Sequence, residues 1–151
     1  MNLILEKTDQ VRWFTNMRDV LDAANIAPQE YDWYVSDIET NWTPPGFSPA
    51  DQWISGDELA SFLRDHEVQF VWAVFSAVPK GFRFTPSSAP YADGNPRYWS
   101  GEEPGPQLDG AVFEIVCWDS SATILINLPE DAARSFVRRY TDARPLSIAR
   151  G

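Results

Sequence analysis

The stretch Glu67–Pro79, which reads EVQFVWAVFSAVP, constrains the fold of this chain more than any other. Side chains alternate between the two faces of a β-strand, and in this stretch both sets of alternate positions are apolar. A strand that is apolar on both faces needs a cover on both faces, as the central strand of a sheet has. We therefore predict that the rest of the chain covers this strand from two sides.

Helical patterns precede and follow the predicted central strand. Residues 8–25 carry apolar side chains at helical spacing. Residues 55–64 begin with Ser55, and Glu58 follows three positions later, which is the pattern of a capping box. A further helix is predicted from Pro129, because two acidic residues follow it in what would be the first turn. These patterns predict three helices.

Other segments have the composition of strands. Tyr31–Thr40 is rich in Tyr, Trp, Val and Ile. Gly110–Trp118 and Ala122–Leu128 are joined across a short polar turn, as in a hairpin. Leu3–Leu5 is either a short edge strand or a segment that packs under the first helix. The sequence therefore predicts one α+β domain over residues 1–151, with a mostly antiparallel sheet of about four strands and three helices packed on it.

Residues 79–107 form an unusually long connection. The segment holds six Pro and four Gly, yet it also holds five aromatic side chains. Loops longer than about 12–15 residues inside compact domains are usually functional or disordered. Disordered segments are poor in aromatic residues, so the composition favours an ordered loop.

The charge of the chain is unevenly distributed. The formal net charge is −10, and residues 1–133 hold 21 of the 22 acidic residues but only seven of the 12 basic ones, which gives −14. Residues 134–151 carry five Arg against one Asp and have a net charge of +4. An acidic body repels phosphate backbones, so we expect no nucleic-acid ligand. The acidity either keeps the protein soluble or steers it toward a basic partner.

Targeting signals are not evident in the sequence. The segment MNLILEK lacks a basic region before its short apolar run, and no run approaches the roughly 20 apolar residues of a membrane span. Cys117 is a single cysteine, which fits a reducing compartment. We therefore expect a cytoplasmic protein that does not bind membranes.

No pattern in the sequence predicts catalysis. Strand periodicity places Asp37 and Glu39 on one face, where two carboxylates could share a proton or a cation. A metal site needs further ligands, and none is found at a matching spacing. His66 is the single histidine and lies where a helix should end, and Cys117 resembles a buried apolar residue. We expect no enzyme activity, no cofactor and no metal site.

Aromatic residues mixed with acidic residues favour a binding surface. Several Trp, Tyr and Phe residues lie in loops beside Asp and Glu. Aromatic anchors in acidic surroundings suit a basic protein target. The alternative is that these rings hold long loops onto the core. The residues predicted to contact a partner are Asp37, Glu39, Trp42, Asp93, Tyr98, Trp99, Glu102 and Glu103.

In size, acidity and Trp-rich strands such as Tyr31–Glu39 and Trp72–Pro79, the chain resembles the small immunity proteins of bacterial toxin–immunity systems, including contact-dependent inhibition and other polymorphic toxins. The resemblance implies a tight complex with a cognate toxin protein that has a basic cleft, and neutralisation by occlusion of the toxin's active site. No functional residue carries over by motif.

Two further functions stay open at this point. One is a non-catalytic small-molecule or regulatory binding domain, in which the 79–107 loop covers a pocket. The other is an enzyme that uses Asp37 and Glu39. Association with a basic protein would depend strongly on salt, whereas an apolar pocket would be nearly indifferent to it.

Overall fold

The computed structural model describes residues 1–149, and within this range the chain forms three α-helices and seven β-strands. The strands are β1 (Leu3–Glu6), β2 (Tyr31–Thr40), β3 (Gln52–Ser55), β4 (Phe70–Pro79), β5 (Phe113–Trp118), β6 (Ala122–Ile126) and β7 (Arg144–Pro145). The helices are α1 (Met17–Ala23), α2 (Gly56–Asp65) and α3 (Glu130–Arg139), and the short 3-10 helices are η1 (Pro28–Glu30), η2 (Pro96–Trp99) and η3 (Leu146–Ile148).

All strands pair antiparallel in one sheet of order β3-β2-β4-β5-β6-β1-β7. The α+β class matches the prediction, but the expected sheet of about four strands is wrong, because residues 1–149 contain seven. The additional strands β3 and β7 have four and two residues, which is too short for an alternating pattern to be recognised. Strand β1 is not an edge strand, because it pairs with both β6 and β7.

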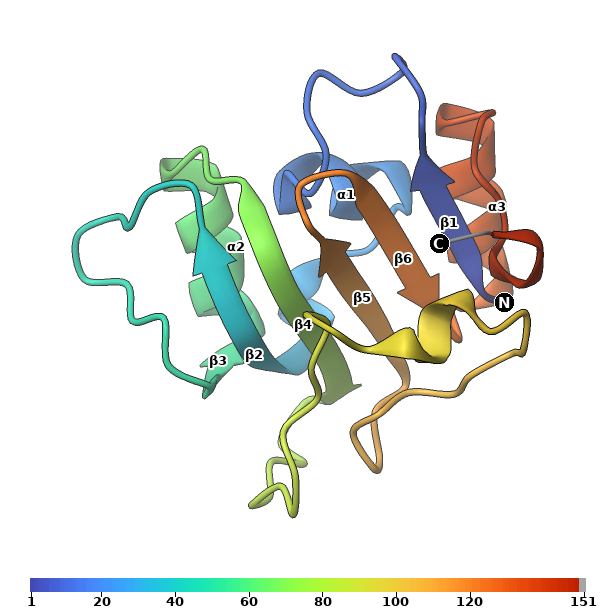
Figure 1. Cartoon of the computed structure of the whole chain (residues 1–151). Coiled ribbons are helices and arrows are strands. Elements are labelled where there is room, and N and C mark those ends of the chain that lie inside the picture. Colours follow the sequence, from blue (N-terminus) through green and yellow to red (C-terminus); the bar gives the residue numbers. More distant parts are fainter. Residues whose placement is uncertain (150–151) are drawn as a thin grey trace.

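The sheet separates two layers of different construction (Figure 1). The helices α1, α2 and α3 lie behind the sheet in this view, and the segment that contains η2 crosses in front of it. Strand β4 lies between β2 and β5, and its residues 73–78 are all buried. The prediction of a central strand covered on both faces is therefore confirmed. None of the helices in residues 1–149 is long and apolar enough to cross a membrane.

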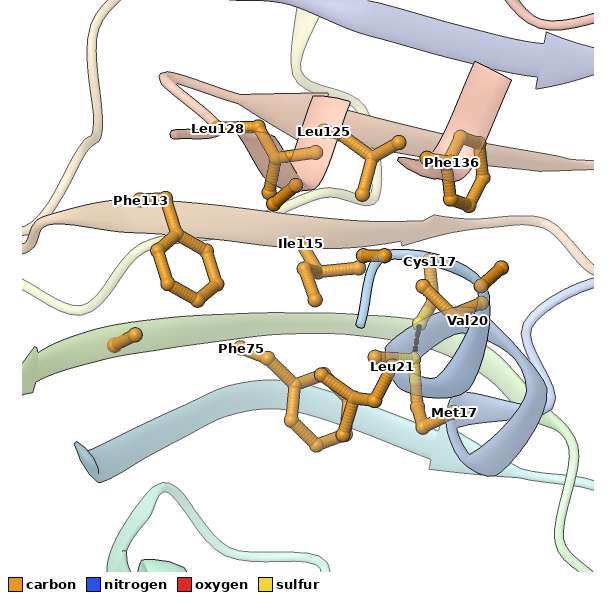
Figure 2. Packing of buried hydrophobic residues seen from close by; sticks show 14 of the residues in the cluster. Met17, Val20, Leu21, Phe75, Phe113, Ile115, Cys117, Leu125, Leu128 and Phe136 are labelled. Atoms are coloured by element: carbon orange, nitrogen blue, oxygen red, sulfur yellow. Dashed lines mark hydrogen bonds between the residues drawn. The ribbon is translucent and has the colours of Figure 1, made fainter. Parts of the chain in front are cut away.

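The main core lies between the sheet and the helices (Figure 2). Phe113, Ile115 and Cys117 alternate along β5 and point to the helix side of the sheet, where Cys117 lies beside α1. The Cys117 thiol lies 3.6 Å from the sulfur of Met17. Burial of each large apolar side chain contributes about 1.5–3 kcal/mol, so this layer holds the helices on the sheet.

Two predicted helices agree with the structure and one does not. The Ser55 hydroxyl accepts a hydrogen bond from the Glu58 backbone N–H at 3.1 Å and caps α2, as the capping-box pattern predicts. The predicted helix over residues 8–25 is much shorter, since α1 begins at Met17. Thr15 has a φ of 62° and its hydroxyl donates to the Phe70 carbonyl oxygen at 2.5 Å, which anchors the preceding segment to β4 as a loop.

Candidate functional site

The segment between β4 and β5 forms the second cover of the sheet. Tyr98 is 2% exposed and Ala92 is fully buried, and both pack in a cluster with Val74 of β4 and Val116 of β5. Leu108, near the end of the segment, packs with Tyr34 and Val78. Of the five aromatic residues in the 79–107 loop, Tyr98 and Trp99 pack against the sheet, whereas Phe82, Phe84 and Tyr91 are exposed.

A buried carboxylate on β5 holds the end of the covering segment. Glu114 has no exposed surface, and its oxygens accept hydrogen bonds from the backbone N–H groups of Gln107 at 2.6 Å and Leu108 at 3.0 Å. Directly opposite on β4, the Ser76 hydroxyl donates to the same carboxylate at 2.6 Å. Ser36 on β2 donates in a similar way to the Pro90 carbonyl oxygen at 2.8 Å.

Burial raises the pKa of Glu114 above its ordinary value, because removing a carboxylate from water disfavours its charged form. The hydrogen bonds from Ser76 and the two backbone N–H groups, and the charge of Arg97, lower it in part. Glu114 therefore acts as a structural acceptor in a dry environment. Sequence reasoning did not single out this residue, although a charged side chain inside the apolar run FEIVCW was the available signal.

The beginning of the covering segment is held by a second buried carboxylate. Asp32 of β2 is 6% exposed and accepts hydrogen bonds from the Gly81 N–H at 2.9 Å and from the Arg83 guanidinium at 3.2 Å. Burial alone would raise the pKa of Asp32, but these two donors and the charge of Lys80 bring it below its ordinary value. Both ends of the segment are thus fixed to the sheet by carboxylates.

The regular alternation that placed Asp37 and Glu39 on one face does not hold in β2, although both carboxylates lie on the side of the covering segment. A β-bulge interrupts the register of β2 after Ser36, and Asp37 has a φ of 55°. Trp33 faces the helix-side core, whereas Glu39 pairs with Trp72, which packs in the cluster on the loop side. The alternation used for the prediction therefore fails at the bulge.

Asp37 has a structural role in the described chain. Its carboxylate accepts hydrogen bonds from the backbone N–H groups of Ala92 at 2.8 Å and Asp93 at 2.9 Å. Its own N–H donates to the Asp51 carboxylate at 3.0 Å. Asp37 thus fixes the middle of the covering segment to the bulge of β2, and its carboxylate is engaged.

The other predicted contact residues are distributed over several surfaces. Tyr98 is a core residue, so the expectation that it is an exposed anchor is wrong. Trp42 is 44% exposed and its indole N–H donates to the Glu67 carbonyl oxygen at 3.1 Å. The exposed side chains Asp93, Glu102 and Glu103 lie along the covering segment. Trp99 is partly buried in the loop-side cluster.

Trp99 belongs to a group of three tryptophans that the sequence did not bring together. Trp72 of β4, Trp118 of β5 and Trp99 of η2 are all partly exposed, and we call these three residues the tryptophan face. The ring centroids of Trp72 and Trp118 are 5.0 Å apart, and those of Trp99 and Trp118 are 5.1 Å apart. The Trp99 indole N–H is buried and has no acceptor in residues 1–149, which is uncommon for a polar group.

Sequence reasoning missed Trp72 and Trp118 as surface residues because both lie in apolar strands. The available signal was their position near strand ends. One row of neighbouring side chains crosses the sheet from strand to strand. It begins with Glu39 and Trp72 and continues with Trp118, Ala122 and Glu6. Trp72 and Trp118 therefore lie on a row that crosses the sheet and has a carboxylate at each end, and Trp99 packs on this row from the covering segment.

The opposite, helix-covered side of the molecule carries a separate groove. This groove has a volume of about 420 Å³ and lies between α1, α2 and η1. The Arg18 guanidinium beside it donates to the Leu63 carbonyl oxygen at 2.9 Å, so this cation is already engaged. Within residues 1–149, no group of three or more His, Cys, Asp or Glu side chains is arranged to hold a metal ion.

Comparisons with known proteins give no relative: no family model matches the chain, and neither the curated proteins nor the solved structures contain a significant match.

Proposed function

We propose that this chain is a protein-binding inhibitor of the immunity type, which neutralises a cognate bacterial toxin by covering a basic cleft around its active site. The observation that carries the proposal is the tryptophan face: three partly exposed tryptophans on one side of the sheet, next to the exposed carboxylate of Glu39. Tryptophan is enriched among the residues that dominate binding energy at protein interfaces.

The position of the tryptophan face favours tight binding. Trp72 and Trp118 are held in neighbouring strands, and Trp99 is held by a segment that several hydrogen bonds fix to the sheet. A surface that is ordered before binding loses less conformational entropy in the complex. With a net charge of −10, the protein also attracts a basic partner over long range.

The alternative of a small-molecule pocket beneath the 79–107 loop has less support. The apolar side chains Ala92, Tyr98 and Leu108 are buried in direct contact with strand residues. The covering segment therefore fills the space over β4 and β5 that such a pocket would require. A hollow of about 450 Å³ remains where the segment begins, beside the exposed rings of Phe82 and Phe84.

The experiment is co-expression with the protein encoded by the immediately neighbouring open reading frame in a naive bacterial host. We expect that protein to be toxic alone, and we expect toxicity to be relieved by this chain through a complex that survives purification. Toxicity that this chain does not relieve, or no toxicity from that reading frame, would refute the proposal in this form.

Variants connect the relief of toxicity to the tryptophan face. We expect Glu39→Lys and Trp118→Ala to weaken the complex, because one reverses the charge beside the face and the other removes its central ring. Matched controls are Glu30→Lys, which reverses an exposed charge in η1 on the helix-covered side, and Phe82→Ala, which removes a ring that is 68% exposed. Equal effects of the controls would refute this assignment of the surface.

A further inference from the structure

The rings of the tryptophan face meet nearly at right angles. The plane of Trp118 makes an angle of 70° with that of Trp72 and of 73° with that of Trp99. The negative face of an aromatic ring attracts cations, and rings set at an angle to one another can contact a cation from more than one side. The three rings are partly exposed, so a cationic group can contact them.

One carboxylate beside the tryptophan face is free to pair with such a cation. Glu39 is exposed, lies opposite Trp72 across the β2–β4 pair, and makes no ion pair within residues 1–149. At the other end of the same row, Glu6 is already paired with Arg144 at 2.7 Å. The unbalanced negative charge of the row therefore lies at Glu39.

One arginine of this chain is itself held by a tryptophan ring and a carboxylate. The Arg12 guanidinium lies 4.0 Å above the Trp13 ring, and it pairs with Glu67 at 3.8 Å. A guanidinium is flat, is weakly hydrated and stacks on tryptophan while its N–H groups reach a carboxylate. The pair Trp72 and Glu39 presents the same two kinds of partner without an arginine between them.

From this geometry we infer that the tryptophan face and Glu39 bind an arginine side chain of the partner protein. The identity of the partner rests on the proposed function, whereas the binding of a guanidinium to this surface does not depend on it. The arginine stacks against the indole rings and its guanidinium donates to the Glu39 carboxylate. This contact makes the proposed function more specific, because it requires the basic cleft of the partner to present an arginine.

The test uses the full-length protein and a small probe. The probe is N-acetyl-arginine N-methylamide, and the control is the corresponding citrulline compound, which has a similar shape but no charge. The indole N–H signals are observed by two-dimensional NMR at constant ionic strength and are assigned with Trp72→Phe and Trp118→Phe. We expect the arginine probe to shift the Trp72 and Trp118 signals progressively, and the citrulline probe to leave them nearly unchanged.

Charge variants complete the test. Glu39→Gln should weaken binding of the arginine probe about two- to fivefold, the range expected for an exposed ion pair. Glu30→Gln removes an exposed carboxylate in η1, on the helix-covered side of the molecule, and should have no effect. Equal shifts with both probes, or no shift at Trp72 and Trp118, would overturn the inference.

The two proposals fail separately. If this chain relieves toxicity but the arginine probe does not bind, the cation site is wrong and the inhibitor role stands. If the probe binds as expected but toxicity is not relieved, the cation site stands and the immunity role is wrong. Concentration-dependent self-association that Glu39→Lys abolishes would assign the tryptophan face to a second copy of the chain and overturn the partner named here.

Discussion

Replacement of Ser76 by alanine tests how the covering segment is fixed to the sheet. The Ser76 hydroxyl is fully buried on β4 and donates to the Glu114 carboxylate at 2.6 Å. Alanine removes this donor with a minimal change in volume. Glu114 keeps its two backbone donors from Gln107 and Leu108, so the variant changes one hydrogen bond in an otherwise intact network.

The magnitude follows from the charge of the acceptor. A hydrogen bond to an ionised group contributes about 1.5–3 kcal/mol, whereas one between neutral groups contributes about 1 kcal/mol. We therefore expect Ser76→Ala to lower the free energy of unfolding by about 2 kcal/mol when Glu114 is ionised. Ser36→Ala is the matched control, because Ser36 is also fully buried but donates to the neutral carbonyl of Pro90. Its expected cost is about 1 kcal/mol.

The cost of Ser76→Ala should depend on pH, and the sign can be derived. Burial raises the pKa of Glu114 in the folded protein above its value in the unfolded protein. The stability that Glu114 contributes is therefore full at a pH below its pKa in the unfolded protein, and it declines as the pH rises through its pKa in the folded protein. The hydroxyl of Ser76 lowers this pKa in part, so its loss raises the pKa of Glu114 further. The variant therefore loses more stability than the native protein as Glu114 ionises, and the cost should grow from about 1 kcal/mol at about pH 4 to about 2 kcal/mol at about pH 8.

Urea unfolding followed by tryptophan fluorescence measures these costs. Both variants and the native protein are compared at the two pH values, and an unchanged denaturant slope shows that the midpoint reports stability. The result that would refute the reasoning is a Ser76→Ala cost that equals the Ser36→Ala cost at pH 8, or one that falls as the pH rises. Either result would mean that Glu114 is not held as an ionised acceptor at high pH.

Three further predictions test other parts of the fold. Gly56→Ala would place a Cβ atom 2.1 Å from the Pro28 carbonyl oxygen, so we expect thermal unfolding to show a loss of about 3 kcal/mol or more, while Gly105→Ala, which meets open space, stays near the native value. The pKa of Asp32 is lowered in the folded protein, so the ionised Asp32 stabilises the fold at a pH above its pKa in the unfolded protein. In urea unfolding, Asp32→Asn should therefore cost about 2 kcal/mol at neutral pH, and this cost should shrink as the pH falls below about 4. Cys117 is fully buried and burial raises the pKa of its thiol, so a disulfide reagent should react only after unfolding; rapid reaction of the native protein would contradict this packing.

The sequence predicted the elements whose signals are local. Strand β2 has the predicted bounds Tyr31–Thr40, and α2 is capped by the residue that the pattern indicates. The central strand β4 was recognised because it is apolar on both faces. From Ala73 to Val78 every residue is buried, and all of them except Ser76 are apolar. Such signals depend on neighbours within a few residues, which a sequence displays directly.

Features that depend on distant contacts could not be predicted in this way. Val11 and Phe14 have helical spacing, yet they pack against the core from a loop, because Thr15 is hydrogen-bonded to β4. The predicted alternation fails at Asp37, because a bulge and the backbone N–H groups of residues 92 and 93 together hold its carboxylate. Neither contact is visible in the sequence around the residue concerned.

The candidate site was predicted only in part, for the same reason. Tyr98 and Trp99 are adjacent and both aromatic, but Tyr98 is 2% exposed, and its hydroxyl accepts a hydrogen bond from the Gln107 side chain. Trp99 instead remains partly exposed beside Trp118. Which of two neighbouring rings becomes core depends on how the covering segment lies on the sheet, and a loop without periodicity does not reveal that.

The tryptophan face is therefore a composite of a sheet and a loop that are distant in sequence. Two of its rings come from the strands, and the third comes from the covering segment, which is fixed to Asp37 and Glu114. The energy that orders this segment is already supplied within the free protein by buried hydrogen bonds. A partner that contacts all three rings consequently does not have to order the loop, and this preorganisation is what a tight and specific inhibitor requires.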